Sequence, residues 1–141
     1  NVSGTMLPFS RHLIEQYVNS AQDIYAVKQL RFIIESKEAK PLGTIDLFDF
    51  DPVNLRAGIG ILIADSQERG KGYAKEALKL ITEYSFTHLG LHGLFCNILE
   101  NNEVSLNLFE SCGFQKIGLK SDWIKTPQGF QNEYLLQLIN D

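Results

Sequence analysis

The sequence lacks the features that mark several large classes of protein. It has only two cysteines, Cys96 and Cys112, in 141 residues, too few for the disulfide framework of a small secreted protein. No apolar run approaches the roughly 18 residues that a membrane-spanning helix needs, and no signal-peptide pattern is visible. We therefore expect a cytoplasmic protein with reduced thiols and no membrane partner.

Positive charge is also scarce. Lys and Arg number 13 against 17 Asp and Glu, a net charge of −4, so the basic surface of a nucleic-acid-binding protein is missing. A mildly acidic surface would suit a cationic substrate, but this charge is too small to decide the point. The three histidines, His12, His88 and His92, are scattered without the spacing of metal ligands, and we expect no metal.

The composition that is present is that of an ordinary globular domain. Apolar residues make up 44% and charged residues 21% of the chain. A chain of this length buries roughly two-thirds of its unfolded surface on folding, which is enough for a hydrophobic core. Residues 1–141 are therefore expected to form a single domain.

The hydrophobic pattern predicts a mixed α/β fold. Strand-like stretches joined by turns predict an antiparallel meander, and they cover residues 29–36, 42–50 and 56–64. The three-and-four spacing of an amphipathic helix occurs at residues 11–22, at 73–88, and from Asn101 or Asn102 to Gly113.

The last two predicted helices are separated by a short buried strand at residues 94–99. A strand, a crossover helix and a strand form a right-handed parallel pair, so this strand is expected beside the one at residues 56–64. Residues 114–124 and 130–139 then predict a C-terminal hairpin.

The junction before the helix at residues 73–88 has the composition of an anion-binding turn. Gly70 and Gly72 allow a tight bend and a close approach to the backbone. The first N–H groups of the helix are unpaired, the helix dipole adds positive charge, and Arg69, Lys71 and Lys75 add more. This arrangement suits a phosphate or pyrophosphate, while a plain turn with solvated basic residues is an equally good interpretation.

Two common phosphate-binding patterns do not fit this junction. The Walker pattern fails because no Gly-Lys-Ser/Thr follows Gly70 at the required spacing. The dinucleotide pattern Gly-x-Gly-x-x-Gly fails because Lys75 stands at the third glycine.

A third pattern fits better. The segment Gln67-Glu-Arg-Gly-Lys-Gly-Tyr-Ala74 resembles the acyl-CoA pyrophosphate loop of the GNAT superfamily of N-acetyltransferases, Gln/Arg-x-x-Gly-x-Gly/Ala. A second segment, Asn102 to Phe114, resembles the later family pattern of Asn-x-x-Ala/Ser, an apolar pair, an aromatic residue and Gly-Phe. The two segments occur in the family's order. The resemblance runs from about Gln29 to the C-terminus and is closest to the ribosomal-protein and spermidine or diamine N-acetyltransferases.

The resemblance implies a fold. It is the GNAT-like acyl-CoA N-acyltransferase fold, a mixed sheet with an antiparallel meander, a splayed parallel strand pair and a C-terminal hairpin. Chains of this family usually open with a strand and a helix before the part seen here. We therefore expect this chain to lack about one strand–helix unit at its N-terminus.

The resemblance also implies acetyl-CoA as co-substrate and a set of residues that hold it. The pyrophosphate would lie on the backbone N–H groups from Arg69 to Ala74, and the pantetheine arm beside the third strand. The Gly60 N–H is our candidate donor to the thioester oxyanion. The implied cofactor-binding residues are Gly60, Ile61, Leu62, Gln67, Glu68, Arg69, Gly70, Lys71, Gly72, Tyr73, Ala74, Asn102 and Phe109.

The sequence departs from the family at both usual catalytic helpers. Phe109 stands where the family often has a tyrosine that protonates the leaving thiolate, and Gly58 stands where a strand glutamate is often found. The amine must lose a proton before it attacks, since a free ammonium has a pKa of about 10.4. No catalytic acid or base can be named from this pattern, and Ser105, Glu133 and Tyr134 are weaker candidates near the site.

The acceptor is expected to be a small primary amine. We favour a polyamine or diamine because Asp46, Asp49 and Asp51 form an acidic group, although such a group is more often a solvated turn. The alternatives are a peptide N-terminus, as in ribosomal-protein acetyltransferases, and a catalytically silent acyl-CoA-binding module. A mixed α/β domain with no cofactor is a third reading. A second copy of the chain is a further candidate partner.

Overall fold

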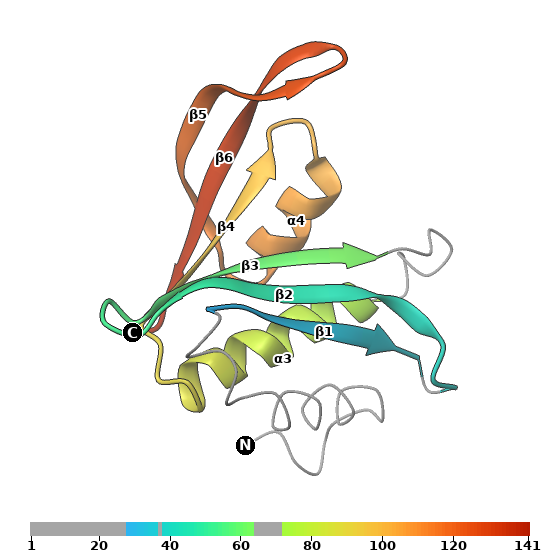
Figure 1. Cartoon of the computed structure of the whole chain (residues 1–141), viewed down its shortest axis with the longest axis vertical. Helices are drawn as coiled ribbons and strands as arrows, with labels where there is room; N and C mark the ends of the chain where they lie inside the picture. The colour runs from blue at the N-terminus through green and yellow to red at the C-terminus, as the bar shows by residue number, and fades with distance from the viewer. Residues whose placement is uncertain (1–27, 37, 64–71) are drawn as a thin grey trace.

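A single mixed sheet organises the chain (Figure 1). The computed structural model describes residues 28–36, 38–63 and 72–141. The helix predicted at residues 11–22 and the predicted cofactor-binding residues Gln67, Glu68, Arg69, Gly70 and Lys71 lie outside them. The six strands follow the order β1-β2-β3-β4-β6-β5.

The elements follow the predicted pattern closely. The strands are β1 Leu30–Glu35, β2 Pro41–Asp51, β3 Arg56–Ile63, β4 Gly93–Leu99, β5 Gln115–Thr126 and β6 Gly129–Ile139, and the helices are α3 Tyr73–Thr87 and α4 Glu103–Ser111. The mixed α/β fold, with a meander, a parallel pair and a C-terminal hairpin, is therefore confirmed. Within the described residues, no helix is long and apolar enough to cross a membrane.

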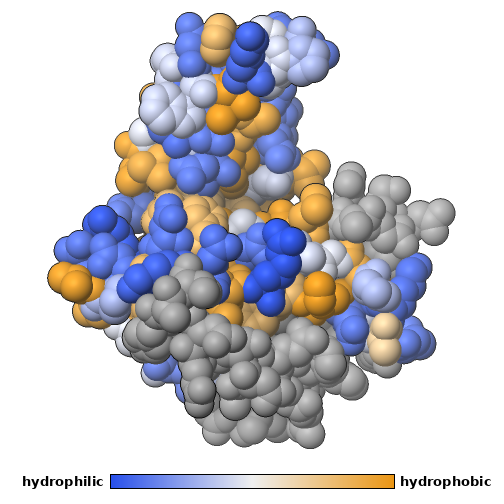
Figure 2. Space-filling view, in the orientation of Figure 1, coloured by the Kyte–Doolittle hydropathy of each residue, from blue (hydrophilic) through white to orange (hydrophobic). Residues whose placement is uncertain are grey.

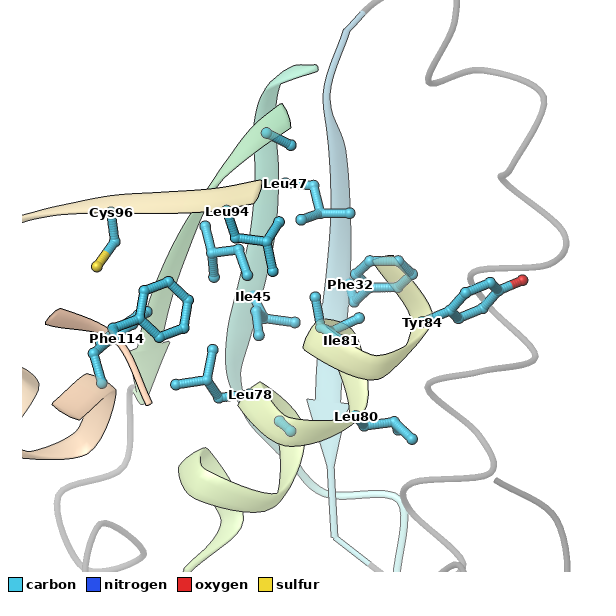
Figure 3. Close-up of a cluster of buried hydrophobic side chains, with 14 of the residues drawn as sticks. Phe32, Ile45, Leu47, Leu78, Leu80, Ile81, Tyr84, Leu94, Cys96 and Phe114 are labelled. Atoms are coloured by element: carbon cyan, nitrogen blue, oxygen red, sulfur yellow. The ribbon is translucent and has the colours of Figure 1, made fainter. Parts of the chain in front are cut away.

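The two helices cover one face of the sheet. Alternate strand residues are buried together with Leu78 and Ile81 of α3 and with Leu106 and Phe109 of α4. Figure 3 shows Leu78 and Ile81 pointing from α3 toward the strands that carry Ile45 and other core residues. Since successive strand side chains alternate between faces, the residues between the core positions lie on the opposite face. We call it the open face because neither α3 nor α4 packs on it.

The parallel pair separates soon after it forms. β3 and β4 are in register only at Arg56–Gly93, Ala57–Leu94 and Gly58–Phe95. Beyond Gly58, β3 stays with β2, whereas β4 continues beside β6 along its whole length. Figure 1 shows the result, with β1 to β3 running one way, β4 to β6 another, and α4 in the angle between them.

One edge of the sheet is formed by β5, the first strand of the long β5–β6 hairpin. Among the described strands, β5 pairs only with β6, and most of its side chains are exposed. Trp123 and Phe130 are among the large apolar side chains at its surface. Figure 2 shows hydrophobic and hydrophilic surface intermixed on this part of the molecule.

Candidate functional site

The separation of β3 and β4 leaves a cleft of about 230 Å³. Its walls come from β3, β4, β6 and α4, and its lining residues are Ile59, Gly60, Ile61, Cys96, Asn97, Ile98, Leu99, Asn102, Ser105, Phe109 and Glu133. By strand alternation, some of these belong to the helix-covered face and others to the open face. Residues of both faces therefore contribute to the lining of the cleft.

The facing edges of the two strands supply polar backbone groups to this cleft. Past Gly58 and Phe95, the β3 and β4 edges have no ladder partner in each other. Buried backbone N–H and C=O groups need partners, and an extended ligand with its own amides can provide them. The cleft is thus suited to a narrow chain that carries amide groups.

Helix α4 forms one wall of the cleft and is fixed by its first residue. The Asn102 side chain caps the helix, with its Oδ1 accepting a hydrogen bond from the Ser105 N–H at 3.1 Å. This is the capping role that asparagine favours, and it settles which of Asn101 and Asn102 begins the helix. Ser105 lies one turn into the helix and contributes to the cleft lining.

Phe109 occupies the position where the family often has a tyrosine. Its side chain is 2% exposed and packs edge-on against Phe114, with ring centroids 5.1 Å apart. Phe109 therefore contributes apolar packing to the cleft wall and offers no proton to a leaving group.

Gly58 occupies the position where a glutamate is often found, and an aromatic pair explains the glycine. The Phe48 and Phe95 rings meet edge-on over this position, with centroids 5.6 Å apart. A Cβ atom on Gly58 would collide with the Phe48 ring and lie 2.9 Å from Phe95 Cζ. The space of a side chain at Gly58 is therefore filled by the two phenylalanines.

This crowding gives a matched pair of glycine substitutions. We expect Gly58→Ala to lower the free energy of unfolding by about 1–3 kcal/mol, because the added methyl group overpacks the two rings. Gly60→Ala should change stability much less, since its Cβ would meet only Phe48 Cε1, at 3.9 Å. Urea unfolding of both variants measures the difference, and equal stabilities would contradict the packing argument.

Cys96 lines the cleft from β4, and its thiol is unreactive. Its side chain is buried, and burial raises the pKa of the thiol to about 12. A thiol with so high a pKa stays protonated near neutral pH and is a poor nucleophile. Cys96 therefore serves the cleft as an apolar wall.

The open face of the cleft carries a polar cluster of Asn97, Lys120 and Glu133. The Lys120 ammonium lies 2.9 Å from Glu133 Oε1 and donates to Asn97 Oδ1 at 2.8 Å. The register pairs Lys120 of β5 with Glu133 of β6 and places Asn97 of β4 opposite Leu135, two residues along β6 from Glu133. Tyr134, next along β6, points to the other face and packs against the core.

The register explains which of these residues could have been found from the sequence. Glu133 and Tyr134 were both candidates, and only the pairing of Glu133 with Leu99 and Lys120 shows that Glu133 faces the cleft. Asn97 and Lys120 were missed because nothing in their local sequence marks them. Their proximity is created by strands distant along the chain.

The acidic group expected to attract a polyamine is engaged within the protein. Arg31 donates to both carboxylate oxygens of Asp46, at 2.8 and 2.9 Å, and this pairing raises the pKa of Arg31. Asp51 closes its own turn by accepting from Asn54, which lowers the pKa of the Asp51 carboxyl. These two carboxylates therefore have structural partners, and the acidic group gives no geometric support for a polyamine site.

The predicted cofactor-binding residues are brought together only in part. Gly60, Ile61, Asn102 and Phe109 surround the cleft, whereas Leu62 is 61% exposed and does not line it. Gly72 begins α3 with a φ of +80°, a conformation that favours glycine, and Tyr73 and Ala74 form the first turn. Within the described residues, no group of three or more His, Cys, Asp or Glu side chains could hold a metal ion.

Comparison with known proteins identifies related chains. Residues 3–115 match the model of the acetyltransferase (GNAT) domain family. The spermidine N(1)-acetyltransferase of Vibrio cholerae is 31% identical over 88 residues, which cover 62% of this chain and 50% of that protein. The Escherichia coli K12 enzyme of the same name is 30% identical over 95 residues, covering 67% and 50%. The chain spans about half the length of these curated relatives.

Solved structures agree on the fold. A variant of the spermidine N-acetyltransferase SpeG from Vibrio cholerae superposes with a TM-score of 0.77, covering 89% of this chain and 74% of that chain. The sequence identity over this match is 24%, so the likeness shows the fold alone.

Proposed function

This chain belongs to the acetyltransferase (GNAT) domain family, and we propose that it transfers an acetyl group from acetyl-CoA to a primary amine. The observation that carries the proposal is the separation of β3 from β4 after Gly58 and Phe95. It leaves a cleft between the two strands, whose edges are no longer paired with each other. Such a cleft suits the amide-bearing arm of acetyl-CoA.

Different residues around the cleft would bind different parts of acetyl-CoA. The strand edge at Gly60 and Ile61 would bind the pantetheine amides, and the Gly60 N–H would stabilise the charge that develops on the thioester oxygen. The start of α3, from Gly72 to Ala74, would bind the pyrophosphate through the backbone N–H groups and the partial positive charge of a helix N-terminus. The adjoining residues Gln67 to Lys71 are proposed to complete this binding site.

A polyamine or diamine is the proposed acceptor. The support comes from the two relatives whose names specify spermidine. A peptide N-terminus is the alternative acceptor, and turnover on peptides without turnover on polyamines would favour it. The cytoplasm is the proposed location, and acetyl-CoA and the amine are the proposed partners.

One observation favours a second candidate function. Phe109 is buried and Gly58 is sealed by Phe48 and Phe95, so neither usual helper position can supply a proton-transfer group. A module that binds acyl-CoA without turnover would have this arrangement. Tight binding of acetyl-CoA with no release of CoA thiol across an amine panel would identify it.

A thermal-shift measurement tests the proposal. At a ligand concentration one hundred times the dissociation constant, acetyl-CoA should add about 2.7 kcal/mol to the free energy of unfolding. For a chain of this size, each kcal/mol raises the melting temperature by roughly 2–4 °C. Thiol release with spermidine then separates an enzyme from a silent module. A melting temperature unchanged by acetyl-CoA would overturn the proposed function.

A further inference from the structure

Glu133 reaches the cleft from the open face of the sheet. It lines the cleft, and its side chain is only 15% exposed. Strand pairing puts Glu133 beside Leu99 of β4, on the face opposite α4. The cleft walls on the other face include Ser105 and Phe109 of α4, so Glu133 and α4 border the cleft from opposite sides of the sheet.

Lys120 holds the Glu133 carboxylate in place, and the carboxylate can still accept further hydrogen bonds. One carboxylate oxygen of Glu133, Oε1, lies 2.9 Å from the Lys120 ammonium. Lys120 is itself fixed by Asn97 Oδ1 and lies 5.2 Å from the centroid of the Trp123 ring. A carboxylate offers about four lone-pair sites on its two oxygens, so one ion pair leaves room for a second cation.

Glu133 is the one charged side chain among the described residues that line the cleft, so it is the group there that can bind a cation. Cys96, on the neighbouring strand β4, stays neutral because burial raises the pKa of its thiol to about 12. The described lining residues from β3 and α4 are apolar or neutral. Lys120 from β5 is the one charged group bonded to Glu133 in the described part of the chain.

We propose that Glu133 is the catalytic residue that receives the acceptor amine, with Lys120 as its positioning residue. This inference rests on the proposed function and adds the base that the two usual positions lack. The Glu133 carboxylate binds the acceptor's ammonium group on the open face and takes one proton from it. The neutral nitrogen is then directed through the cleft toward the strand edge at Gly60.

The proton and electron balance of this step is complete without another reactant. The ammonium gives one proton to Glu133, and the nitrogen lone pair forms the bond to the acetyl carbon. The carbon–sulfur bond breaks, its electron pair stays on the sulfur, and a second proton from the nitrogen passes to this thiolate. Glu133 returns its proton to water, which leaves an acetylated amine and CoA thiol.

The test is the substitution Glu133→Gln, which keeps the shape of the side chain and removes its charge. The first readout needs no turnover, because it is the calorimetric affinity for spermidine of protein saturated with CoA. We expect this affinity to fall by about tenfold or more, while the affinity for CoA is unchanged. In steady-state assays with acetyl-CoA, kcat/KM for spermidine should fall by about 100-fold or more, the usual effect of losing a general base.

Two further variants test whether the charge of Glu133 and its position in the cleft, rather than a general loss of structure, cause these effects. Glu110→Gln removes the same charge from the exposed side of α4, outside the cleft, and should leave both readouts unchanged. Glu133→Asp keeps the charge and should restore part of the spermidine affinity. Spermidine affinity and kcat/KM within twofold of wild type in Glu133→Gln would overturn the proposal. If the wild-type protein binds no acetyl-CoA, the proposed function itself fails.

The role of Lys120 is tested by rescue with a second cation. Lys120→Met should lower both the spermidine affinity of the CoA-saturated protein and kcat/KM for spermidine, because Glu133 loses the ion pair that orients its carboxylate. Lys120→Arg keeps a cation that can pair with Glu133 and should restore most of both readouts. Equal losses in the two variants would overturn the positioning role of Lys120.

Discussion

Ser105→Phe is expected to abolish useful binding of acetyl-CoA. Ser105 lies on α4 and lines a cleft of only about 230 Å³. A phenyl ring at this position would occupy much of that space between α4 and the β3 edge. We expect the affinity for acetyl-CoA to fall at least 100-fold, which corresponds to about 2.8 kcal/mol. Calorimetric titration with acetyl-CoA measures the loss.

The neighbouring residue supplies the control for this substitution. Val104 is on the same helix, but its side chain is 74% exposed and does not line the cleft. Val104→Phe adds a ring of the same kind to solvent and should leave the affinity within about twofold. Equal affinities for the two variants and the wild type would show that the cleft does not bind acetyl-CoA.

Leu78→Ala is expected to cost more stability than any surface substitution in the chain. Leu78 is fully buried where α3 packs on the sheet, and Figure 3 shows it directed toward Ile45. Removing a buried leucine side chain leaves a cavity and typically costs about 2–5 kcal/mol. The whole free energy of unfolding of a domain is about 5–15 kcal/mol, so this loss is severe. Urea unfolding measures it.

An exposed leucine tests whether burial is the cause. The Leu62 side chain is 61% exposed, and Leu62→Ala should change the free energy of unfolding by only about 0.5 kcal/mol. If both variants lost the same amount, the packing of α3 against the sheet would not explain the stability of the domain.

Much of the fold could be predicted from the sequence because local patterns carry it. The three-and-four spacing in α3 and the alternation in β2 each describe one buried face, and the ends of these elements were found to within one or two residues. The parallel neighbour of β3 followed from a strand, a helix and a strand in succession. Hydrophobic burial and chain connectivity are both visible in a single sequence.

Less of the site could be predicted from the sequence, because the pairing of strands that are distant along the chain brings its residues together. The aromatic pair that fills the space at Gly58 comes from β2 and β4, and neither Phe48 nor Phe95 is marked by its neighbours. The direction of Glu133 likewise depends on its pairing with Leu99 and Lys120. An alternating strand leaves the choice between its two faces open until its partners are known.

The narrow join between β3 and β4 divides the sheet into two halves. Every other strand pairing lies within one of two continuous stretches, residues 30–63 and 93–139. Among the described strands, the three parallel pairs at Arg56, Ala57 and Gly58 are the backbone pairing that joins the two halves. A ligand lying across that seam would contact both halves, so its binding would stabilise the junction where the sheet itself is held by the fewest strand pairs.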